Sequence, residues 1–378
     1  MENFSYHNPV KIIFGRQTIA QLANEIPANA KVLMTYGGGS IKKNGVYEQV
    51  KAALAGFDLL EFGGIEPNPH YETCMKAVEL IRKEKVAFLL AVGGGSVVDG
   101  TKLIAAAVSF AGNPWDIVAR RAPFASALPI GVVLTLPATG TEMNGNSVVT
   151  RAATQEKLSF SSPLVYPKFS ILDPETTYSL PPRQISNGVV DAFVHVAEQY
   201  MNPPANAPLQ DYYAESILKV LIEEGPRALS APQDYNVRAN VMWAATMALN
   251  GLIACGVPQD WSTHEIGHEL TALHGLDHGQ TLAVVMPGVW RTLRAQKFDK
   301  LLQMGKRVFG IAGGSPEERV EAAIDATENF FRSLGTKTKL AEYGLDETVI
   351  EPVAQRFAAR QHPFITPDMV RKVLRQRL

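Results

Sequence analysis

Four of the eight histidines in the chain lie in one short stretch, residues 264–279, which reads HEIGHELTALHGLDHG. Its first five residues, from His264 to His268, match the H-E-x-x-H pattern, in which two histidines on one helix face bind zinc and the glutamate acts as a base. Imidazole nitrogens are common ligands of divalent metals. The stretch is therefore a candidate metal site, and the pattern leaves open which reaction the metal would serve.

A second pair of candidate ligands, Asp191 and His195, lies in the apolar segment VVDAFVHVAEQY. The i, i+4 spacing places both on one face of a helix. Both groups are costly to bury unless something binds them. Together with His264 and His278 they form a set of one carboxylate and three imidazoles. Such a set suits Fe²⁺ or Zn²⁺ and does not suit Ca²⁺ or Mg²⁺.

A zinc peptidase is the alternative interpretation of the same stretch. It would use both histidines of the pattern as ligands, Glu265 as the base and His274 as the third ligand. The longer peptidase pattern needs a glycine three residues after the second histidine, where this chain has Thr271. We therefore expect the helix to continue and to carry His274 away from the other two histidines. This alternative also leaves the Asp191 and His195 pair without a role.

Two glycine-rich turns with the sequence GGGS occur in the first half of the chain, at residues 37–40 and 93–96. Each follows a strand-like segment and precedes a helix-like one. Glycine lets the backbone approach an anion closely, and the start of a helix offers free N–H groups. Neither turn matches the standard dinucleotide or P-loop fingerprint. Two such turns at equivalent places nevertheless predict a bound nucleotide.

The first turn also indicates which dinucleotide to expect. Enzymes that prefer NAD usually carry an acid near this position to bind the ribose 2′-hydroxyl. The segment GGGSIKK has no carboxylate, and it offers Ser40 with Lys42 and Lys43 nearby. A 2′-phosphate would meet no repulsion there, so NADP is the predicted cofactor. The alternative for the two lysines is that they are only solvated helix residues.

The elements that must position these residues differ between the two halves of the chain. Strand and helix patterns alternate in the first half, which predicts a parallel α/β sheet. The predicted strands are 32–36, 57–62, 87–92 and 168–174, with helices at 41–54, 71–85 and 97–108 and a hairpin within 146–160. After residue 183 only helical patterns occur: 184–200, 208–224, 236–254, 260–273, 281–295, 298–309, 315–334, 347–360 and 366–377. We expect an α/β dinucleotide-binding domain at residues 1–181 and a helical metal-binding domain at residues 182–378.

The composition narrows the class of protein. The formal net charge is −1 with no basic block, so electrostatic binding to nucleic acid or to an anionic membrane is not expected. No apolar run is long enough to cross a bilayer, and the first residues do not resemble a signal peptide. Cys74 and Cys255 are the only cysteines, which suits a reducing compartment. We expect a cytoplasmic enzyme.

The long segments around these motifs resemble the iron-activated (group III) alcohol dehydrogenases, and most of all the bacterial NADPH-dependent aldehyde reductases, also called butanol dehydrogenases. The resemblance covers nearly the whole chain except the C-terminal helix. It is carried by TYGGGSIKKNGVY, EFGGIEPNP, LLAVGGGSVVDGTK, TLPATGTEMN, LPPRQISNGVVDAFVHVAEQY, NVMWAATMALNGLI and GVPQDWSTHEIGHELTALHGLDHGQT.

The resemblance implies a dehydroquinate synthase-like fold, with a Rossmann-like N-terminal domain and an all-α C-terminal domain. It implies metal ligation by Asp191, His195, His264 and His278. It implies cofactor contacts from Gly38, Gly39, Ser40, Asn68, Gly94, Gly95, Ser96, Asp99, Thr135, Thr139 and Lys157. His268 corresponds to a family histidine that lies near the metal without binding it and relays protons.

The activity that follows is a reversible, NADPH-dependent reduction of aldehydes to primary alcohols with a broad substrate range. It would need one Fe²⁺ or Zn²⁺ ion, and the family implies a homodimer. Trp261 and Asn144 are expected to line the substrate pocket. The alternatives are an NAD-linked polyol or glycerol dehydrogenase, a dehydroquinate-synthase-like lyase of the same fold, and the metallopeptidase. The lyase would need basic residues for a phosphorylated substrate, and no such cluster accompanies the metal residues.

Overall fold

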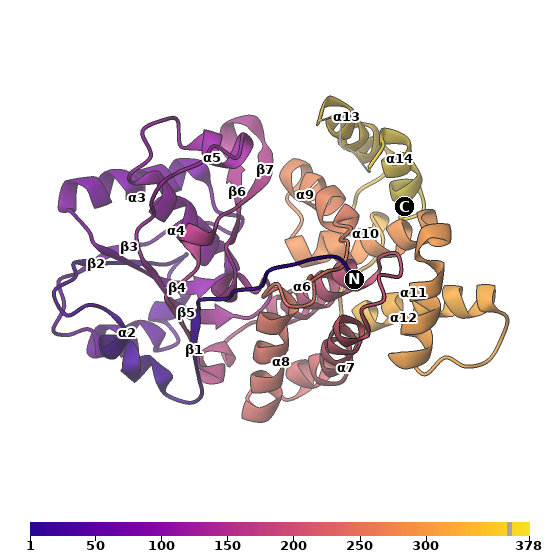
Figure 1. Ribbon diagram of the computed structural model, residues 1–378, viewed down its shortest axis with the longest axis horizontal. Helices are drawn as coiled ribbons and strands as arrows, with labels where there is room; N and C mark the ends of the chain where they lie inside the picture. Colours follow the sequence, from indigo (N-terminus) through magenta and orange to yellow (C-terminus); the bar gives the residue numbers. More distant parts are fainter. Residues whose placement is uncertain (361–364) are drawn as a thin grey trace. The chain divides into compact units, whose positions relative to one another are not determined.

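The computed structural model describes residues 1–360 and 365–378, and the chain forms two compact units (Figure 1). The first, here called the α/β unit, comprises His7–Leu180 together with Pro232–Thr246. The second, here called the helical unit, comprises Met1–Tyr6, Pro181–Ala231 and Met247–Leu378. None of the helices in the described part of the chain has both the length and the apolar character needed to cross a membrane.

A parallel sheet forms the centre of the α/β unit. Its six strands lie in the order β1-β8-β5-β4-β2-β3, and all their pairings are parallel. The strands are β1 (Lys11–Phe14), β2 (Val32–Thr35), β3 (Leu59–Phe62), β4 (Phe88–Gly94), β5 (Ile130–Leu136) and β8 (Phe169–Leu172). A separate antiparallel hairpin of β6 (Asn146–Arg151) and β7 (Glu156–Ser161) lies where the sequence predicts one. The predicted α/β class is confirmed. Two strands of the sheet were not predicted: the edge strand β1, with only one buried residue, and the inner strand β5.

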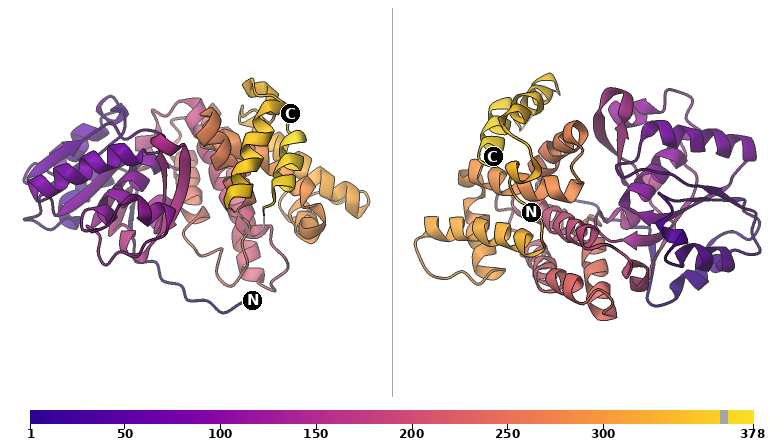
Figure 2. Two further views of the ribbon diagram at one scale, coloured as in Figure 1. Left: turned by 90° about the horizontal axis from the view of Figure 1, so that it is seen from above. Right: turned by 180° about the vertical axis from the view of Figure 1, so that it is seen from behind.

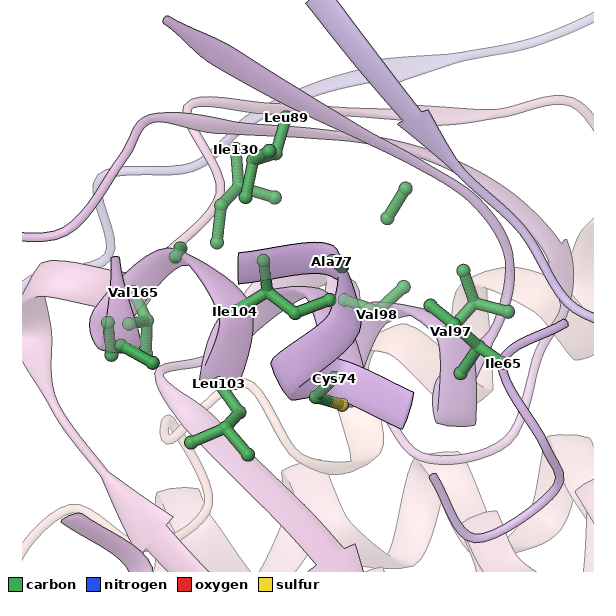
Figure 3. Close-up of a cluster of buried hydrophobic side chains, with 14 of the residues drawn as sticks. Ile65, Cys74, Ala77, Leu89, Val97, Val98, Leu103, Ile104, Ile130 and Val165 are labelled. Carbon is green, nitrogen blue, oxygen red and sulfur yellow. The ribbon is translucent and has the colours of Figure 1, made fainter. Parts of the chain in front are cut away.

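Helices cover both faces of this sheet, as a parallel sheet requires. They are α1 (Leu22–Glu25), α2 (Val46–Ala53), α3 (Tyr71–Glu84), α4 (Gly95–Ala107) and α5 (Trp115–Ala119). Leu89 of β4 packs with Val98 and Ile104 of α4 in one core (Figure 3). The neighbouring residues of β4, Phe88 and Leu90, belong to the opposite core. Successive strand residues point to opposite faces, so a continuous apolar run such as FLLAV is what this sheet needs.

The predicted helix at 41–54 is wrong at its start. Residues Ser40–Lys42 form one 3₁₀ turn, and α2 begins only at Val46. Gly45 separates the two, because its φ of 82° lies in the left-handed region that cannot continue a right-handed helix. The apolar spacing that suggested one helix therefore spans two elements.

The helical unit is built around α10 (His278–Thr292). Figures 1 and 2 show the surrounding helices from three sides. They are α6 (Pro182–Tyr200), α7 (Pro208–Ser230), α9 (Ser262–His274), α11 (Arg294–Arg307), α12 (Pro316–Ser333), α13 (Ile350–Arg360) and α14 (Pro367–Arg375), while α8 (Tyr235–Ala248) contributes its residues up to Thr246 to the α/β unit. Every residue of α10 from 281 to 290 is buried, and the helix packs against α6, α9, α12 and α14. A helix that is apolar on all sides occupies such a central place.

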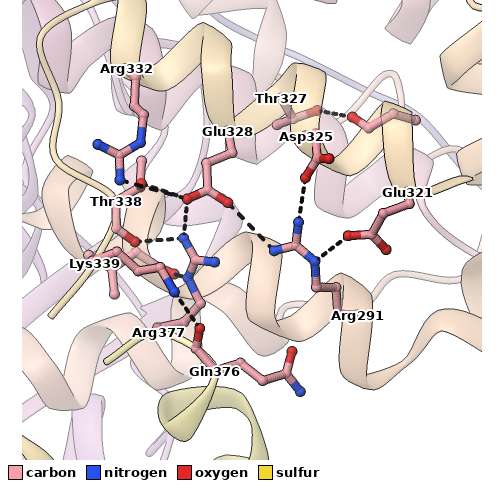
Figure 4. A network of polar contacts seen from close by, with 12 residues as sticks. Arg291, Glu321, Asp325, Thr327, Glu328, Arg332, Thr338, Lys339, Gln376 and Arg377 are labelled. Atoms are coloured by element: carbon pink, nitrogen blue, oxygen red, sulfur yellow. Dashed lines mark hydrogen bonds and ion pairs between the residues drawn. The ribbon is translucent and has the colours of Figure 1, made fainter.

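A buried arginine links the end of the C-terminal helix α14 to the central helix α10 (Figure 4). Arg377 is 1% exposed, and its Nε donates to the carbonyl oxygen of Val284 at 2.9 Å. Its Nη2 donates to Glu328 Oε1 at 2.5 Å and to the Thr338 carbonyl oxygen at 2.7 Å. Arg291 pairs with the other oxygen of Glu328 at 3.5 Å. The segment after α14 is thereby tied to α10 and α12.

Replacing Arg377 with Ala should lower the stability of the helical unit, because Glu328 then loses its closest charged partner. Removing one member of a buried pair costs about 3–5 kcal/mol, and that is an upper bound because Arg291 remains. Urea denaturation followed by circular dichroism would measure the loss. Arg371→Ala is the control, since Arg371 pairs with Glu351 and Asp368 at the surface. Equal denaturation midpoints for the two variants would contradict this account.

Candidate functional site: a metal centre and two glycine turns

The predicted metal ligands come from three helices of the helical unit. Asp191 and His195 lie one turn apart on α6, where they are 3% and 5% exposed. His264 lies in the first turn of α9, and His278 is the first residue of α10. The structure therefore brings together residues that are more than eighty positions apart in the sequence.

Three ring nitrogens surround one carboxylate oxygen, Oδ1 of Asp191. His195 Nδ1 lies 3.5 Å from it, His264 Nε2 3.6 Å and His278 Nε2 3.5 Å. Two ligands that each bind a tetrahedral ion at 2.0–2.2 Å are about 3.3–3.6 Å apart. The spacing therefore suits one small divalent cation among these four atoms, and this donor set of one oxygen and three nitrogens fits Fe²⁺ or Zn²⁺.

The tightest part of this cluster consists of Asp191, His195 and His264, whose ligand atoms lie within 4.8 Å of one another. His278 reaches the shared oxygen but stands outside that tighter group, and its side chain is 21% exposed. Nδ1 of His195 and Nε2 of His264 are buried and make no hydrogen bond to any described residue. Buried polar atoms without a partner are costly, so these two nitrogens point to a bound ligand.

The electrostatic environment shifts the pKa values of the two buried histidines, His195 and His264, in opposite directions. Burial lowers the pKa of His195 to about 4, which keeps its ring neutral and its lone pair available for a cation. Burial also opposes the protonation of His264, but the carboxylates of Glu198 and Asp191 outweigh it and raise the pKa of His264 to about 9. The same carboxylates attract a metal cation to this place.

Hydrogen bonds at the start of α10 hold His278. Asp277 caps this helix in a reciprocal capping box with Gln280. Its Oδ2 also accepts hydrogen bonds of 2.8 Å from Arg183 and Asn187, both of which lie on α6. The helix that supplies Asp191 therefore also fixes the start of the helix that supplies His278.

Two further predicted residues lie beside the ligands. The ring of His268 is 5.1 Å from that of His278 and 6.1 Å from that of His264, centroid to centroid. Trp261 packs edge-on against His264 at 5.4 Å and against His195 at 6.2 Å. Both are next to the cluster without belonging to the set around Asp191.

The peptidase alternative does not fit this geometry. Helix α9 runs without a break through Thr271 to His274 and ends at Gly275, whose φ is 71°. Ten residues of helix separate His264 from His274 by about 15 Å along the axis. The two histidines therefore cannot bind one ion, as the missing glycine predicted.

The two GGGS turns lie at the carboxyl ends of neighbouring strands in the α/β unit. Strands β2 and β4 pair in parallel, and residues 37–40 follow the first while residues 93–96 end the second and begin α4. From β2 the chain continues to β3 on one side, and from β4 it continues to β5 on the other. Such a switch point is where open parallel sheets bind their ligands.

The backbone of the first turn adopts the left-handed conformation that glycine permits. Gly39 has a φ of 91°, and Gly38 and Ser40 are exposed. Lys42, expected near a 2′-phosphate, already has partners. Its ammonium lies over the rings of Tyr36 and Tyr47, at 5.0 and 4.8 Å, and 3.7 Å from Glu61 Oε2. Comparable ring and carboxylate contacts are not seen for Lys43 among the described residues.

The second turn brings several predicted cofactor residues together. A Cβ on Gly95 would lie 2.6 Å from Oγ1 of Thr139, so glycine is needed where α4 begins. The backbone N–H of Asn68 donates to Ser96 Oγ at 3.1 Å. Asn68 itself has a φ of 55°. Thr135 is buried on β5, and Gly94 packs against the same strand at Leu136.

A fully buried lysine, Lys102, organises the loop behind this turn, and its role was not predicted from the sequence. Its Nζ lies 2.7–2.8 Å from the carbonyl oxygens of Thr141, Asn144 and Asn146 and 2.7–3.2 Å from the side-chain oxygens of the first two, so its three hydrogens are shared among five acceptors. Burial lowers the pKa of Lys102 to about 8, against the attraction of the Asp99 carboxylate. A lysine in the apolar segment DGTKLIAAA is costly to bury unless bound, and this signal was available in the sequence.

Asp99 is the second anchor of the same loop. Its Oδ1 accepts from Thr141 Oγ1 at 2.6 Å, and its Oδ2 accepts from the Val148 N–H at 3.0 Å. Burial raises the pKa of Asp99, and the ammonium groups of Lys102 and Lys157 oppose this. Asn144, expected to line the substrate pocket, is 4% exposed and takes part in this buried loop network.

Comparison with known families covers nearly the whole chain. Residues 9–174 match the family described as iron-containing alcohol dehydrogenase. Residues 185–373 match the C-terminal part of the Fe-containing alcohol dehydrogenase family. The predicted resemblance to this family is confirmed in both halves.

Individual relatives agree with this. The NADPH-dependent aldehyde reductase YqhD of Escherichia coli (strain K12) is 58% identical over 359 residues, which are 94% of this chain and 93% of the relative. The NADP-dependent alcohol dehydrogenase 3 of Entamoeba histolytica is 44% identical over 364 residues, with 94% and 93% coverage. Probable NADH-dependent butanol dehydrogenase 1 of Bacillus subtilis is 42% identical over 364 residues, with 95% and 94% coverage.

Solved structures agree in fold. The crystal structure of E. coli K-12 YqhD superposes with a TM-score of 0.98 at 54% identity, covering 100% of this chain and 99% of that one. NADH-dependent butanol dehydrogenase A from Thermotoga maritima superposes with a TM-score of 0.94 at 38% identity, with 100% and 99% coverage. The chain therefore belongs to the iron-containing alcohol dehydrogenase family.

Proposed function

We propose that this protein is an NADPH-dependent and metal-dependent reductase of aldehydes, which also oxidises primary alcohols in the reverse direction. The observation that carries the proposal is the arrangement of three imidazole nitrogens 3.5–3.6 Å from one oxygen of Asp191. This arrangement suits one Fe²⁺ or Zn²⁺ ion, and the chain belongs to the iron-containing alcohol dehydrogenase family. The proposed division of labour is a dinucleotide-binding domain at residues 1–181 and a metal-binding domain at residues 182–378.

The two sites would supply different parts of the reaction. A divalent cation acts as a Lewis acid on the aldehyde oxygen, and a reduced nicotinamide supplies the hydride. The proposed ligands of the cation are Asp191, His195, His264 and His278. His268 is proposed to hold a proton beside this set, a role that its ring position next to His278 supports. Trp261, which packs against His195 and His264, is proposed to line the substrate pocket.

The dinucleotide is proposed to lie across the switch point between β2 and β4. The backbone N–H groups at the start of α4 would bind its pyrophosphate, with contacts from Gly94, Gly95 and Ser96. Asp99 belongs to the same proposed pyrophosphate turn. The proposed contacts at the adenosine end are Gly38, Gly39, Ser40 and Asn68, and those near the ribose and nicotinamide are Thr135, Thr139 and Lys157. The absence of a carboxylate in GGGS at residues 37–40 favours NADP over NAD. A homodimer is the further expectation from the resemblance, and a cytoplasmic location is the expectation from the composition, which includes only two cysteines.

The first test follows NADPH absorbance with butyraldehyde, on protein stripped by a chelator and then given Fe²⁺ or Zn²⁺ separately. We expect metal-dependent loss of NADPH that is faster than the loss of NADH measured in parallel. His264→Ala should lose both metal and turnover, whereas His274→Ala, on the same helix, should keep both. No oxidation of either cofactor with either metal, across short and aromatic aldehydes, would exclude the reductase.

The cofactor preference can be tested at Ser40. Ser40→Asp places a carboxylate where a 2′-phosphate would bind, and like charges repel. We expect the ratio of kcat/KM for NADPH to that for NADH to fall at least tenfold, or ~1.4 kcal/mol. Ser40→Ala is the control and should change the ratio much less. An unchanged ratio in Ser40→Asp would place the 2′-phosphate elsewhere or favour the NAD-linked alternative.

The loop held by Lys102 gives a third prediction. Lys102→Met leaves three buried carbonyl groups without their shared donor and removes the charge beside Asp99. We expect the dissociation constant for NADPH, measured by fluorescence titration, to rise about tenfold or more. The matched control is Lys297→Met, which removes a buried lysine that binds Asp260 at 2.6 Å in the helical unit. That control should lower thermal stability but leave NADPH binding unchanged. Equal effects on NADPH binding would refute a role specific to Lys102.

A further inference from the structure

We propose that Glu198 is a positioning residue for the metal centre, and that it fixes the ring of His264 in the tautomer and orientation that a metal needs. The inference rests on the proposed metal centre and adds a residue to it. Glu198 lies on α6, three residues after His195 and seven after Asp191, and therefore on the same helix face. It is 3% exposed.

Both oxygens of the Glu198 carboxylate contact the start of α9. Oε2 pairs with Nδ1 of His264. Oε1 accepts the backbone N–H of Thr263 at 2.6 Å and that of His264 at 3.4 Å. One side chain of α6 therefore binds both the backbone and the ring of the residue that supplies a ligand.

The start of α9 needs such a partner. The first four N–H groups of a helix have no acceptor within the helix. Trp261 precedes α9, and its indole makes no capping hydrogen bond. Glu198 supplies the missing acceptor from a neighbouring helix, and the positive end of the α9 dipole stabilises its negative charge in return. The contact between the Glu198 carboxylate and the first N–H groups of α9 is therefore favourable independently of the His264 ring.

The chemistry of the contact selects the tautomer. An ionised carboxylate can only accept hydrogen bonds. Nδ1 of His264 therefore carries a hydrogen, and when the ring is neutral, as it must be to bind a metal, its lone pair lies on Nε2. That nitrogen is the one 3.6 Å from Oδ1 of Asp191 and without a hydrogen bond to any described residue. A carboxylate behind a ligating histidine also makes the imidazole a stronger ligand.

The two carboxylates of α6 therefore fix the orientation of the His264 ring, one at each of its nitrogens. Glu198 holds Nδ1, and Asp191 lies in front of Nε2. The stacking of His195 on His264, with ring centroids 4.5 Å apart, restricts the remaining rotation of the ring. Without Glu198, Nδ1 and Nε2 would compete for the hydrogen, and the ring could turn.

The test measures metal affinity rather than turnover. Zn²⁺ dissociation constants are obtained by competition with a chromophoric chelator, and the visible spectrum of the Co²⁺-loaded protein reports the ligand geometry. We expect Glu198→Ala to weaken Zn²⁺ binding 10- to 100-fold and to change the Co²⁺ spectrum. Glu198→Gln keeps an acceptor for the Thr263 N–H but loses the charge, and should weaken Zn²⁺ binding about tenfold. It also covers the case in which Glu198→Ala does not fold.

Glu215→Gln is the matched control. Glu215 is a buried carboxylate of the same unit with three partners: Tyr200 Oη at 2.9 Å, Gln303 Nε2 at 2.9 Å and Arg307 Nη1 at 3.2 Å. None of these partners is a proposed metal ligand. The variant should lose thermal stability but keep the Zn²⁺ affinity and the Co²⁺ spectrum of the unmodified protein.

The Asp191→Ala variant distinguishes a failure of the role proposed for Glu198 from a failure of the proposed metal centre. If Asp191→Ala loses Zn²⁺ while both Glu198 variants bind it within twofold of the unmodified protein, the role of Glu198 is refuted and the metal centre stands. If Asp191→Ala itself keeps the original affinity, the metal centre is refuted and the role of Glu198 with it. Weakened Zn²⁺ binding in both Glu198 variants, with Glu215→Gln unaffected, supports the inference.

Discussion

One buried carboxylate, that of Asp191, sets the requirements for the rest of the helical unit. A negative charge that is 3% exposed is stable only with partners that compensate for its lost hydration. Three imidazoles from three helices meet at one of its oxygens. The packing of α6, α9 and α10 therefore also brings the proposed metal ligands together. The central position of α10 follows, because its first residue must reach Asp191 while its apolar length fills the core.

In the α/β unit, the proposed anionic ligand would be bound mainly by backbone groups of the two glycine turns, with Lys157 as its proposed basic side chain. Glycine turns at the ends of β2 and β4 offer backbone N–H groups at a switch point, and a Cβ would close the approach at Gly95. The positive charge that does lie nearby, on Lys102, is buried and used to fix the loop that carries Thr139 and Thr141.

The parts of this structure that the sequence predicts are those that depend on local spacing. Asp191 and His195 follow from an i, i+4 pair in an apolar helix, and strands β2, β3 and β4 follow from apolar runs next to glycine. The roles of Glu198 and Lys102 were missed, although both are ionisable residues in apolar helical segments. Their partners lie far away in the chain, 66 positions in the case of His264, and a periodic pattern carries no information about them. Helix α2 was placed too early for a related reason, since spacing alone does not reveal the left-handed turn at Gly45.

The hydrogen bonds that orient the proposed ligands have a consequence for how the protein acquires its ion. Glu198 orients His264, and Asp277, bound by Arg183 and Asn187, orients the start of α10, and these contacts are all made between parts of the protein itself. Since the four proposed donor atoms suit iron and zinc alike, the metal content of a preparation would reflect the supply of each ion in the growth medium rather than a choice made by the protein.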